Sequence, residues 1–371
     1  MPPFDYQPLG RVAFAPGALA RVGELVRELG GSRVLLVTDP GLEAAGHPQR
    51  AVQALREARL DVAVFDAVEE NPTDRHVAAG VEAARKHAAD FLVAIGGGSA
   101  MDVAKGTNFI LINGGRMSDY RGYGKAAKPM LPSIGVPTTA GTGSEAQSYA
   151  LIADESSHLK MACGDRKVAF RVAVLDPEVT VTQPAMVTAV TGIDSMSHAL
   201  ESFVCTKRTP FSQMLSRQAW ALLNANIETV LAEPDNLPAR AAMQLGAHLA
   251  GMAIENSMLG CAHSCANPLT AHYGITHGIA VGVMLPSVIR YNAAMVGSLY
   301  AELDPGGAES LARRVTALMQ SANLPVNLPA LGVSRSIVPV LAEEAAQQWT
   351  AQFNPRPATA SELARLYEAA F

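Results

Sequence analysis

The chain is short of the features that mark several large classes of protein. Only 5% of its 371 residues are aromatic and 17% are charged, and the formal net charge is −5 at pH 7. It has no cluster of lysine and arginine of the kind that follows a phosphate backbone, so we expect no nucleic-acid partner. Apolar stretches are interrupted by charge, glycine or proline before they could span a bilayer, so we expect no membrane partner either.

Cysteine is scarce, and no export signal is visible. Residues 1–6, Met-Pro-Pro-Phe-Asp-Tyr, contain neither a basic segment nor an apolar core. The four cysteines include no Cys-x-x-Cys pair. Cys261 and Cys265 flank His263, but they are better explained as small apolar residues packed in a helix than as metal ligands. These features favour a reducing, cytoplasmic location.

The first half of the chain alternates β-rich runs with helical patterns, and the length suits two domains. The expected strands are residues 33–39, 61–65, 91–95, 133–136 and 172–175. The expected helices include residues 18–29, ended by Gly30 and Gly31, and residues 73–89, capped by Thr73. Continuous apolar strands joined by amphipathic helices predict a mostly parallel sheet with helices on both faces.

The second half shows no such strand signals. It has the Ala- and Leu-rich amphipathic pattern of long helices, with Pro184 expected in a first turn. Breaks are expected at Pro210, Pro234 to Pro238, Pro268, Pro286 and residues 325–329. We therefore expect an α/β domain over residues 1–180 and an all-helical domain over residues 181–371. The short boundary near residues 176–178 suggests that the two pack closely around a cleft.

A glycine-rich loop follows the strand that ends near Ile95. Residues 96–102 read Gly-Gly-Gly-Ser-Ala-Met-Asp and open a helix. Glycines let backbone N–H groups approach a pyrophosphate, and a helix N-terminus adds unpaired donors and partial positive charge. Ser99 and Asp102 have the spacing of a capping box. The motif is neither G-x-G-x-x-G nor a Walker loop; phosphate binding is the better explanation, with a simple tight turn as the alternative.

Two further features lie at strand ends. Residues 136–145 place four hydroxyl side chains and two glycines after a strand, a composition that suits ribose and phosphate oxygens or an ordinary capped turn. Asp39 ends the strand that begins at Arg33. A carboxylate there can bind a ribose hydroxyl and repel a 2′-phosphate, which favours NAD over NADP, although it can equally form a turn before Pro40.

Four residues of the second half have the side chains and order of a metal site. Asp194 and His198 are four apart in an expected helix, so their side chains share one face, one turn apart. His263 and His277 follow. Three imidazoles and one carboxylate suit Fe(II) or Zn(II). One histidine on an apolar helix is usually structural, but four such residues in this order favour a metal, which the glycine loop upstream makes catalytic.

With these features together, the chain resembles the iron-containing (group III) alcohol dehydrogenase family over nearly its full length. The shared motifs are Asn71-Pro-Thr73, residues 96–102, residues 137–145, Asp194-x3-His198, His263-x13-His277 and Asn354-Pro-Arg-Pro357. The resemblance implies a dinucleotide-binding α/β domain, a helical domain and an active site between them. It also implies NAD(H)-linked oxidation of small alcohols or reduction of aldehydes, with the metal polarising the substrate oxygen.

The same resemblance implies particular contacts and a homodimer. The metal ligands would be Asp194, His198, His263 and His277. The cofactor contacts would be Gly97, Gly98 and Ser99 at the pyrophosphate, Thr138, Thr139 and Thr142 at the nicotinamide half, Lys160 at a ribose, Asp39 for NAD preference, and Asn71 and Asp102 from the shared motifs. Tyr149, Ile254 and Phe353 would lie near the substrate pocket and favour small uncharged substrates. Dimers in the family can pair N-terminal strands, here residues 10–14.

One position departs from the family pattern. Many members carry a histidine, thought to assist proton transfer, where this chain has Asn267. An amide does not titrate near neutral pH. Either Asn267 has a role in catalysis beside His263 and His277, with protons leaving through water, a ribose hydroxyl or His272, or it only caps the turn before Pro268.

Three other readings stay open from the sequence. The substrate could be acidic, such as maleylacetate, a 2-hydroxy acid or a phosphonoaldehyde, with Arg290 or Arg356 as its partner. The enzyme could be a lyase of the dehydroquinate synthase type, in which NAD is recycled. The chain could be a nucleotide-binding scaffold without activity, although the presence of all four ligands and both loops argues against that.

Overall fold

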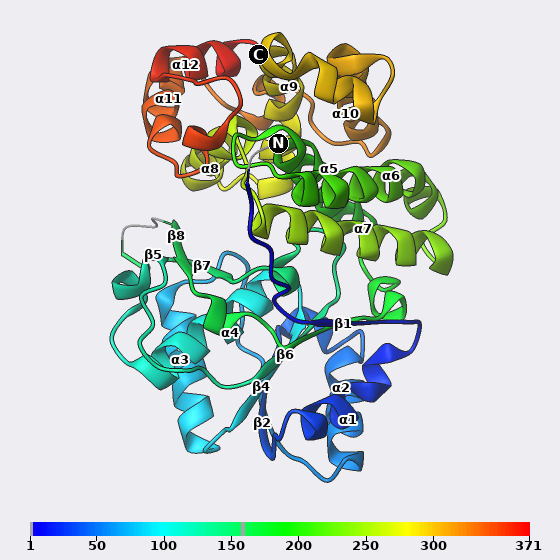
Figure 1. Cartoon of the computed structure of the whole chain (residues 1–371), viewed down its shortest axis with the longest axis vertical. Coiled ribbons are helices and arrows are strands. Elements are labelled where there is room, and N and C mark those ends of the chain that lie inside the picture. Colours follow the sequence, from blue (N-terminus) through cyan, green and yellow to red (C-terminus); the bar gives the residue numbers. More distant parts are fainter. Residues whose placement is uncertain (1–2, 157–159) are drawn as a thin grey trace. The chain divides into compact units, whose positions relative to one another are not determined.

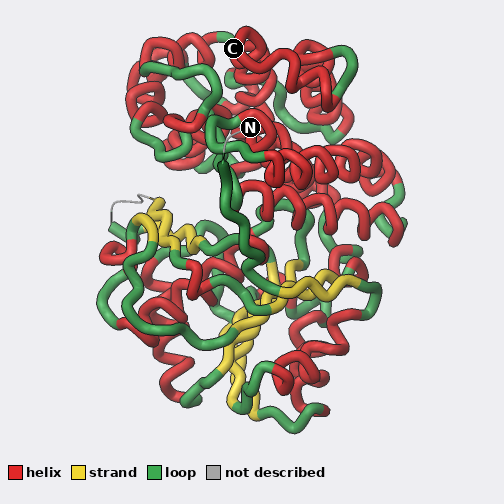
Figure 2. The backbone as a smooth tube through the Cα atoms, viewed as in Figure 1, coloured by secondary structure: helices red, strands yellow, loops and turns green. Residues whose placement is uncertain are grey.

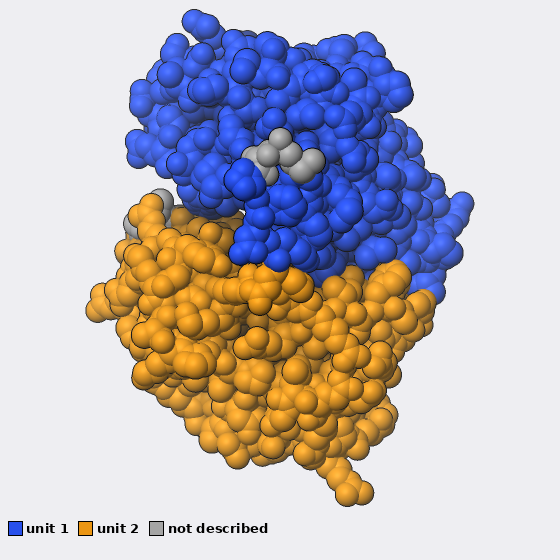
Figure 3. Space-filling view, viewed as in Figure 1, with its two compact units in different colours: residues 1–6, 184–371 blue, residues 7–183 orange. Residues whose placement is uncertain are grey.

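The computed structural model describes residues 3–156 and 160–371. The chain forms two compact units, which Figure 3 colours separately. One unit runs from Gln7 to Gln183; the other combines Pro184–Phe371 with the N-terminal segment up to Tyr6. The division falls three residues after the boundary expected at residue 180. The N-terminal segment joins the helical unit through Tyr6, whose ring packs on that of Phe211.

A six-stranded sheet forms the centre of the first unit, and all its pairings are parallel. The strand order is β1 (Arg11–Phe14), β9 (Val172–Leu175), β6 (Ser133–Pro137), β4 (Phe91–Gly96), β2 (Arg33–Val37) and β3 (Asp61–Phe65). Figure 2 shows these strands in yellow with red helices around them. The predicted parallel sheet is confirmed, and each of the five expected strands is present.

Alternate residues of the strands point to two separate cores. Val34 and Leu36 of β2 belong to the core beneath α1 (Val22–Glu28) and α2 (His47–Glu57). Leu35 and Val37 of the same strand belong to the core beneath α3 (Asp74–Lys86) and α4 (Gly98–Asn113). Because successive side chains of a strand point to opposite faces, an uninterrupted apolar run buries both faces of the sheet.

The helix boundaries show where local sequence decides the structure. Residues 18–29 form a 3-10 turn, η1 (Ala18–Arg21), followed by α1, and Gly30 ends this segment with φ 83°. Thr73 occupies the N-cap of α3, as expected, in a capping box with His76. The remaining 3-10 turns of this unit are η2 (Pro40–Leu42), η3 (Met117–Tyr120), η4 (Ser144–Ala146), η5 (Arg166–Val168) and η6 (Pro177–Thr180).

The unit also contains a small second sheet that the sequence analysis missed. Its order is β5 (Gly122–Tyr123), β8 (Lys160–Gly164) and β7 (Tyr149–Ala153), with β7 antiparallel to β8. These strands are two to five residues long, and β5 and β8 contain glycine, lysine and alanine, which are depleted in strands. Pairing with neighbours, rather than local sequence, makes them extended.

The second unit contains helices and no strand among its described residues. The α-helices are α5 (Ala185–Val204), α6 (Pro210–Ala232), α7 (Leu237–Glu255), α8 (Cys261–Tyr273), α9 (His277–Leu303), α10 (Gly307–Ser321), α11 (Val338–Ala346) and α12 (Ala360–Glu368), labelled in Figure 1. The 3-10 turns are η7 (Pro329–Leu331), η8 (Arg335–Ile337) and η9 (Ala351–Phe353).

Prolines behave differently at helix ends and in helix interiors here. Pro184 lies at the N-cap of α5, just before the first turn, and Pro210 begins α6. The breaks expected at Pro268 and Pro286 are wrong, since both lie inside helices, α8 and α9. An internal proline costs roughly 3 kcal/mol. Both are buried, so packing of the surrounding helix offsets that cost.

Helix α9 is long and apolar enough to pass a composition test for a membrane span. The most apolar window of this helix is 67% buried within the structure. A helix that is apolar on all sides is expected where neighbouring helices surround it. Its composition is therefore explained by its place among the helices of its own unit.

Candidate active site

The glycine loop joins β4 to α4 at the carboxyl edge of the sheet. Gly97 is the N-cap of α4, and no side chain caps this helix end. The capping box expected between Ser99 and Asp102 is therefore wrong. The helix begins at Gly98, which places Ser99 in the first turn and Asp102 beyond it. The first N–H groups of α4 consequently have no capping side chain, which is the arrangement that binds anions at helix N-termini.

The predicted cofactor residues around this loop lie close to it. A Cβ on Gly96 would lie 3.2 Å from Oδ2 of Asp39, and one on Gly98 would lie 2.7 Å from Cγ2 of Thr142. A Cβ on Gly97 would lie 3.5 Å from Thr139. The structure thus brings the ends of β2, β4 and β6 together at one edge, with room for backbone and little room for side chains above the loop.

The topology marks this edge as a ligand-binding position. From β2 the chain passes to β3 on one side and then returns to β4 on the other side. In open parallel sheets, ligands bind at the carboxyl ends of strands where the strand order reverses in this way. Thr138, which follows β6, donates its N–H to the Gly96 carbonyl at 2.9 Å and ties the hydroxyl-rich loop to the glycine loop.

Asp39 lies beside the glycine loop at the end of β2. Burial raises the pKa of its carboxyl group, and the N–H groups of Leu42 and Gly41 lower it in part. Its Oδ2 lies against Gly96 of the glycine loop, a position consistent with binding a ribose hydroxyl.

A buried polar network supports the hydroxyl-rich loop, and the sequence analysis missed its centre. Lys105 is 1% exposed and donates to the Ser144 carbonyl, the Ser144 hydroxyl and the Tyr149 carbonyl, each at 2.7 Å. Ser144 in turn donates to Oδ1 of Asp102 at 2.7 Å. Burial raises the pKa of Asp102, while the charge of Lys105 lowers it. Asp102 therefore supports this loop from within the core.

The small sheet brings three more predicted residues to the same side of the unit. Ala153 of β7 lies between Lys160 of β8 and Thr73, with which it forms an isolated bridge. Asn71 precedes that bridge and has φ 53°, a left-handed conformation that asparagine tolerates. Tyr149 begins β7 and packs on Tyr123 with ring centroids 5.6 Å apart. Positions far apart in the sequence thus become neighbours.

The predicted metal ligands converge within the helical unit. Asp194 and His198 lie on α5, His263 is the third residue of α8, and His277 is the first of α9. Ligand atoms of Asp194, His263 and His277 all lie within 4.8 Å of one another. Nε2 of His198 lies 3.5 Å from Oδ1 of Asp194, and its ring stacks on that of His263 with centroids 5.0 Å apart.

The chemistry of this cluster fits a divalent metal. Oδ1 of Asp194 and Nε2 of His263 are buried 3.6 Å apart, too far for a good hydrogen bond, and neither has a hydrogen-bond partner among the described residues. Burial raises the pKa of Asp194, but His198 and the other two imidazoles lower it further than burial raises it. Such a carboxylate requires a nearby positive charge, which a proton or a metal cation can supply.

The pKa of His263 is shifted in the opposite direction, upward. Burial lowers the pKa of its imidazole, but the carboxylates of Asp194 and Glu201 raise it more, to about 9. Glu201, which no sequence motif indicated, is 4% exposed and lies 2.5 Å from Nδ1 of His263. Asp194, His198 and Glu201 are spaced four and three residues apart on α5, so their spacing could have revealed a shared face.

The other candidates of the helical unit lie outside this cluster. Asn267, one turn after His263, donates to Oε1 of Gln348 at 3.0 Å, and the exposed His272 is bonded to Glu344 at 2.9 Å. Ile254 is buried on α7, and Phe353 lies beneath the ammonium of Lys207. The two arginines considered for an acidic substrate contact other groups: Arg290 forms two hydrogen bonds with Glu309, and Arg356 stacks on Tyr291.

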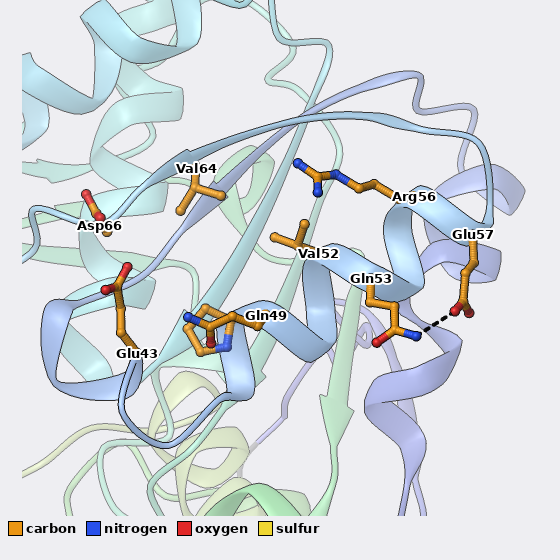
Figure 4. Close-up of a pocket in the computed structure, with 9 residues that line it drawn as sticks. Glu43, Gln49, Val52, Gln53, Arg56, Glu57, Val64 and Asp66 are labelled. Atoms are coloured by element: carbon orange, nitrogen blue, oxygen red, sulfur yellow. Dashed lines mark hydrogen bonds between the residues drawn. The ribbon is translucent and has the colours of Figure 1, made fainter.

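A hollow of about 610 Å³ lies elsewhere on the α/β unit (Figure 4). Its lining comes from α2, β3 and the segments beside them, with Val52 and Val64 on its apolar side and Arg56 among its polar residues. Neither the glycine loop nor any other predicted site residue lines it. A nucleotide-type sheet together with a carboxylate–histidine cluster, rather than this hollow, is typical of metal-dependent dehydrogenases that use a dinucleotide.

Comparison with known proteins gives the family. Residues 10–177 match the family model described as iron-containing alcohol dehydrogenase, and residues 188–371 match the C-terminal model of the same family. The chain therefore belongs to the iron-containing alcohol dehydrogenase family. The resemblance seen in the motifs, the two-part fold and the enzyme class, an oxidoreductase acting on CH–OH groups, are confirmed.

Individual relatives agree with this assignment. The NAD-dependent methanol dehydrogenase of Bacillus methanolicus is 34% identical over 94% of this chain and 95% of its own length. The 1,3-propanediol dehydrogenase of Klebsiella pneumoniae is 34% identical over 99% of both chains. The crystal structure of a 1,3-propanediol oxidoreductase matches with a TM-score of 0.96 at 34% identity over 100% of both chains.

Proposed function

We propose that this protein is a metal-dependent, NAD(H)-linked dehydrogenase that interconverts small uncharged alcohols and aldehydes. The observation that carries the proposal is the convergence of Asp194, His263 and His277 within 4.8 Å, with His198 beside Asp194. Family membership supports the reaction class, and the glycine loop supports the dinucleotide.

Four residues of the helical unit would hold the metal: Asp194, His198, His263 and His277. When bound, iron(II), or zinc(II) in its place, supplies Lewis acidity toward the substrate oxygen, and the nicotinamide supplies or accepts hydride. The protein's own part is to keep the carboxylate ionised and the imidazoles oriented. Burial of Asp194 and His263 excludes water, which strengthens their electrostatic attraction to a cation.

The α/β unit would hold NAD at the carboxyl edge of its sheet. The N–H groups at the start of α4, around Gly97, Gly98 and Ser99, would bind the pyrophosphate, and Thr138, Thr139 and Thr142 would line the nicotinamide half. Asp39 would accept a ribose hydroxyl and repel a 2′-phosphate, which supports NAD over NADP. Asn71, Asp102 and Lys160 would support the same cofactor through the loop and small sheet that contain them.

The proposed substrate is a small alcohol or aldehyde. Relatives named for methanol and 1,3-propanediol support a small alcohol, as do the apolar side chains of Tyr149, Ile254 and Phe353. We propose that Asn267 acts in substrate positioning rather than proton transfer, because its amide does not titrate and is bonded to Gln348. Protons would then leave through water or a ribose hydroxyl.

A homodimer in the cytoplasm completes the proposal. β1 is an edge strand paired only with β9 in the described sheet, and its Val12 and Phe14 are 41% and 42% exposed. Unpaired edges with apolar side chains favour pairing with a second copy. All four cysteines are buried and free, which supports a reducing compartment. Light scattering of wild type and Val12→Lys would test the dimer; a variant that stays dimeric would exclude this edge.

The decisive experiment is metal-dependent turnover. Purified protein, stripped of metal and then supplied anaerobically with Fe(II) or Zn(II), is assayed by NADH absorbance with a panel of alcohols and aldehydes. We expect turnover only with added metal, and larger kcat/KM for small uncharged substrates than for acidic ones. Absence of net turnover in protein that binds both metal and NAD would contradict the proposal.

A further inference from the structure

The N-terminus of α8, which carries His263, has no cap of its own. The first N–H groups of any helix lack intrahelical acceptors and need others when they are buried. The N-cap residue here is Gly260, which has no side chain, and no side-chain cap bond is formed by it. Cys261, Ala262 and His263, the first three residues of the helix, are all buried. Their acceptors must come from other parts of the chain.

Glu201 of α5 supplies two of the contacts. Its Oε1 accepts the N–H of Ala262 at 2.8 Å, and its Oε2 lies 2.5 Å from Nδ1 of His263. One carboxylate therefore binds both the backbone of the first turn and the side chain of the predicted metal ligand. Negative charge at a helix N-terminus is also stabilised by the helix dipole.

Asn354, from the Asn354-Pro-Arg-Pro357 motif, supplies the next contact. Its Oδ1 accepts the N–H of Cys261 at 3.2 Å. The amide is held in place because its Nδ2 donates to Oδ1 of Asn292 at 2.7 Å and to the Arg356 carbonyl at 2.6 Å. Asn354 is 2% exposed. Asn354 thus accepts the N–H of the first helical residue, Cys261, and Glu201 accepts the N–H of the second, Ala262.

The glycine at position 260 is explained by the same two side chains. A Cβ on Gly260 would lie 2.8 Å from Oδ1 of Asn354 and 3.0 Å from Oε1 of Glu201. The first distance is shorter than Cβ atoms adopt and the second is unusually tight, so any other residue would displace the Asn354 acceptor. Absence of a side chain at the N-cap is therefore what allows two distant side chains to replace it.

We infer that Glu201 and Asn354 are positioning residues for the metal centre, which together form a composite cap on α8 and hold His263 with Nε2 toward Asp194. With Nδ1–H donated to Glu201, the other ring nitrogen keeps its lone pair for a metal. Asn354 acts one step further away by fixing the helix start that carries the ring. This inference rests on the proposed function, since it assigns these residues to the same metal.

Substitution of Glu201 by glutamine tests the carboxylate. A carboxylate accepts at both oxygens, whereas an amide accepts at one and donates at the other. Glu201→Gln must therefore lose either the acceptor for Ala262 N–H or the acceptor for His263 Nδ1–H. We expect the dissociation constant for Co(II), measured by competition with a chelator on the full chain, to rise about 10- to 100-fold. The d–d absorption spectrum of bound Co(II) should also change.

Glu344→Gln is the matched control. Glu344 also bonds a histidine of α8, His272, but that pair lies at the surface, with side chains 41% and 34% exposed. Both variants replace a glutamate that bonds a histidine of α8 by glutamine. Because His272 is not a predicted ligand, the Co(II) affinity and spectrum of Glu344→Gln should stay at the wild-type values. Asn354→Asp keeps the acceptor for Cys261 but loses the donors to Asn292 and Arg356, and should weaken Co(II) binding about fivefold.

The possible outcomes distinguish failure of the composite cap from failure of the proposed metal site. Wild-type protein that binds no Co(II), or binds it unchanged after His263→Ala, would contradict the metal site itself. Wild-type binding with unchanged affinity and spectrum in Glu201→Gln would overturn the composite cap. A lower melting temperature of the metal-free variant with an unchanged spectrum would also overturn it, by showing a structural role only. If Glu201→Gln does not fold, the Co(II) affinity and absorption spectrum of Asn354→Asp test the composite cap instead.

Discussion

In the α/β unit the candidate nucleotide site is made mostly of backbone, whereas in the helical unit the candidate metal site is made of side chains. Gly97 and Gly98 contribute N–H groups and open space, and Thr142 approaches Gly98 closely only because no side chain is there. Asp194 and His263 contribute ligand atoms from two helices. Backbone sites depend on the path of the chain, and side-chain sites depend on how elements pack.

This difference affects what each site tolerates. A backbone site is damaged by adding atoms, because added side chains occupy the space for the ligand. A side-chain site is damaged by removing atoms, because each metal–ligand bond depends on one particular side chain. Substitutions of the two kinds should therefore affect cofactor binding and metal binding separately.

The largest effect is expected from removing a ligand. His263→Ala should remove stoichiometric metal and lower kcat/KM by about 10³-fold or more, since several kcal/mol of charge stabilisation are lost. NAD affinity, measured by fluorescence titration, should change little. Metal analysis of the purified variant checks the first part. A variant that retained metal and full turnover would refute the ligand assignment.

Next in size is the buried network beneath the hydroxyl-rich loop. Lys105→Met removes three hydrogen bonds and leaves the buried Asp102 without the ammonium 3.8 Å away. We expect a loss of about 3 kcal/mol in the free energy of unfolding of this unit, measured with denaturant. Lys167→Met is the control, since the side chain of Lys167 is 42% exposed and its buried partner Asp165 keeps two backbone N–H donors. This change should cost less than about 1 kcal/mol.

The same variant should show a pH dependence of known sign. Burial raises the pKa of Asp102 above its unfolded value, and loss of Lys105 removes an interaction that lowers it. A carboxyl group whose folded pKa is raised favours folding below its unfolded pKa, and this contribution is lost as pH rises through the folded pKa. The destabilisation by Lys105→Met should therefore grow with rising pH. A pH-independent loss would show that the charge of Asp102 is not involved.

A smaller effect is expected from filling the glycine loop. Gly98→Val would place atoms against Thr142, and we expect NAD affinity to fall about 10- to 100-fold while metal content stays unchanged. Gly97→Ala makes only ordinary contact with Thr139 in the protein itself. A loss of NAD affinity in Gly97→Ala with an unchanged melting temperature would therefore report on the ligand. Unchanged NAD affinity in both variants would exclude this loop as the pyrophosphate site.

The smallest change is expected at Asp39. Asp39→Gly should lower the preference for NAD over NADP about tenfold, measured as a ratio of kcat/KM values, by removing the repulsion of a 2′-phosphate. Because burial raises the pKa of this carboxyl group, the wild-type preference should weaken as pH falls toward that pKa. Asp66→Gly, a change at another acidic position of the same unit, should leave the ratio unchanged.

The five expected strands and the start of α3 were readable because their signals are local. Val34 to Val37 form an uninterrupted apolar run, and Thr73 supplies its own cap, so neighbouring residues alone contain the information. The small sheet was missed because its strands are at most five residues long, and β8 contains lysine, alanine and glycine, which become extended here by pairing. Pro268 and Pro286 were misread because local propensity is outweighed where a helix is buried.

The candidate metal ligands were readable for a different reason. Asp194 and His198 are one helical turn apart, and His263 and His277 complete a set of three imidazoles and one carboxylate. Glu201 was missed although it lies on the same helix, because nothing in a sequence shows which distant ring a carboxylate will meet. Ser99 and Asp102 had the spacing of a capping box, but the helix began two residues earlier than that box requires.

By itself the sequence determined the parallel sheet, the helical second half, the glycine loop and the set of candidate ligands, since each follows from residue type and short-range periodicity. Only the tertiary structure decided that Glu201 and Asn354 meet at the start of α8, that Lys105 is buried beneath the hydroxyl-rich loop, and that Arg290 and Arg356 are bonded elsewhere. These contacts join residues far apart in the chain, and their formation depends on how the helices and strands pack, which short-range patterns do not contain.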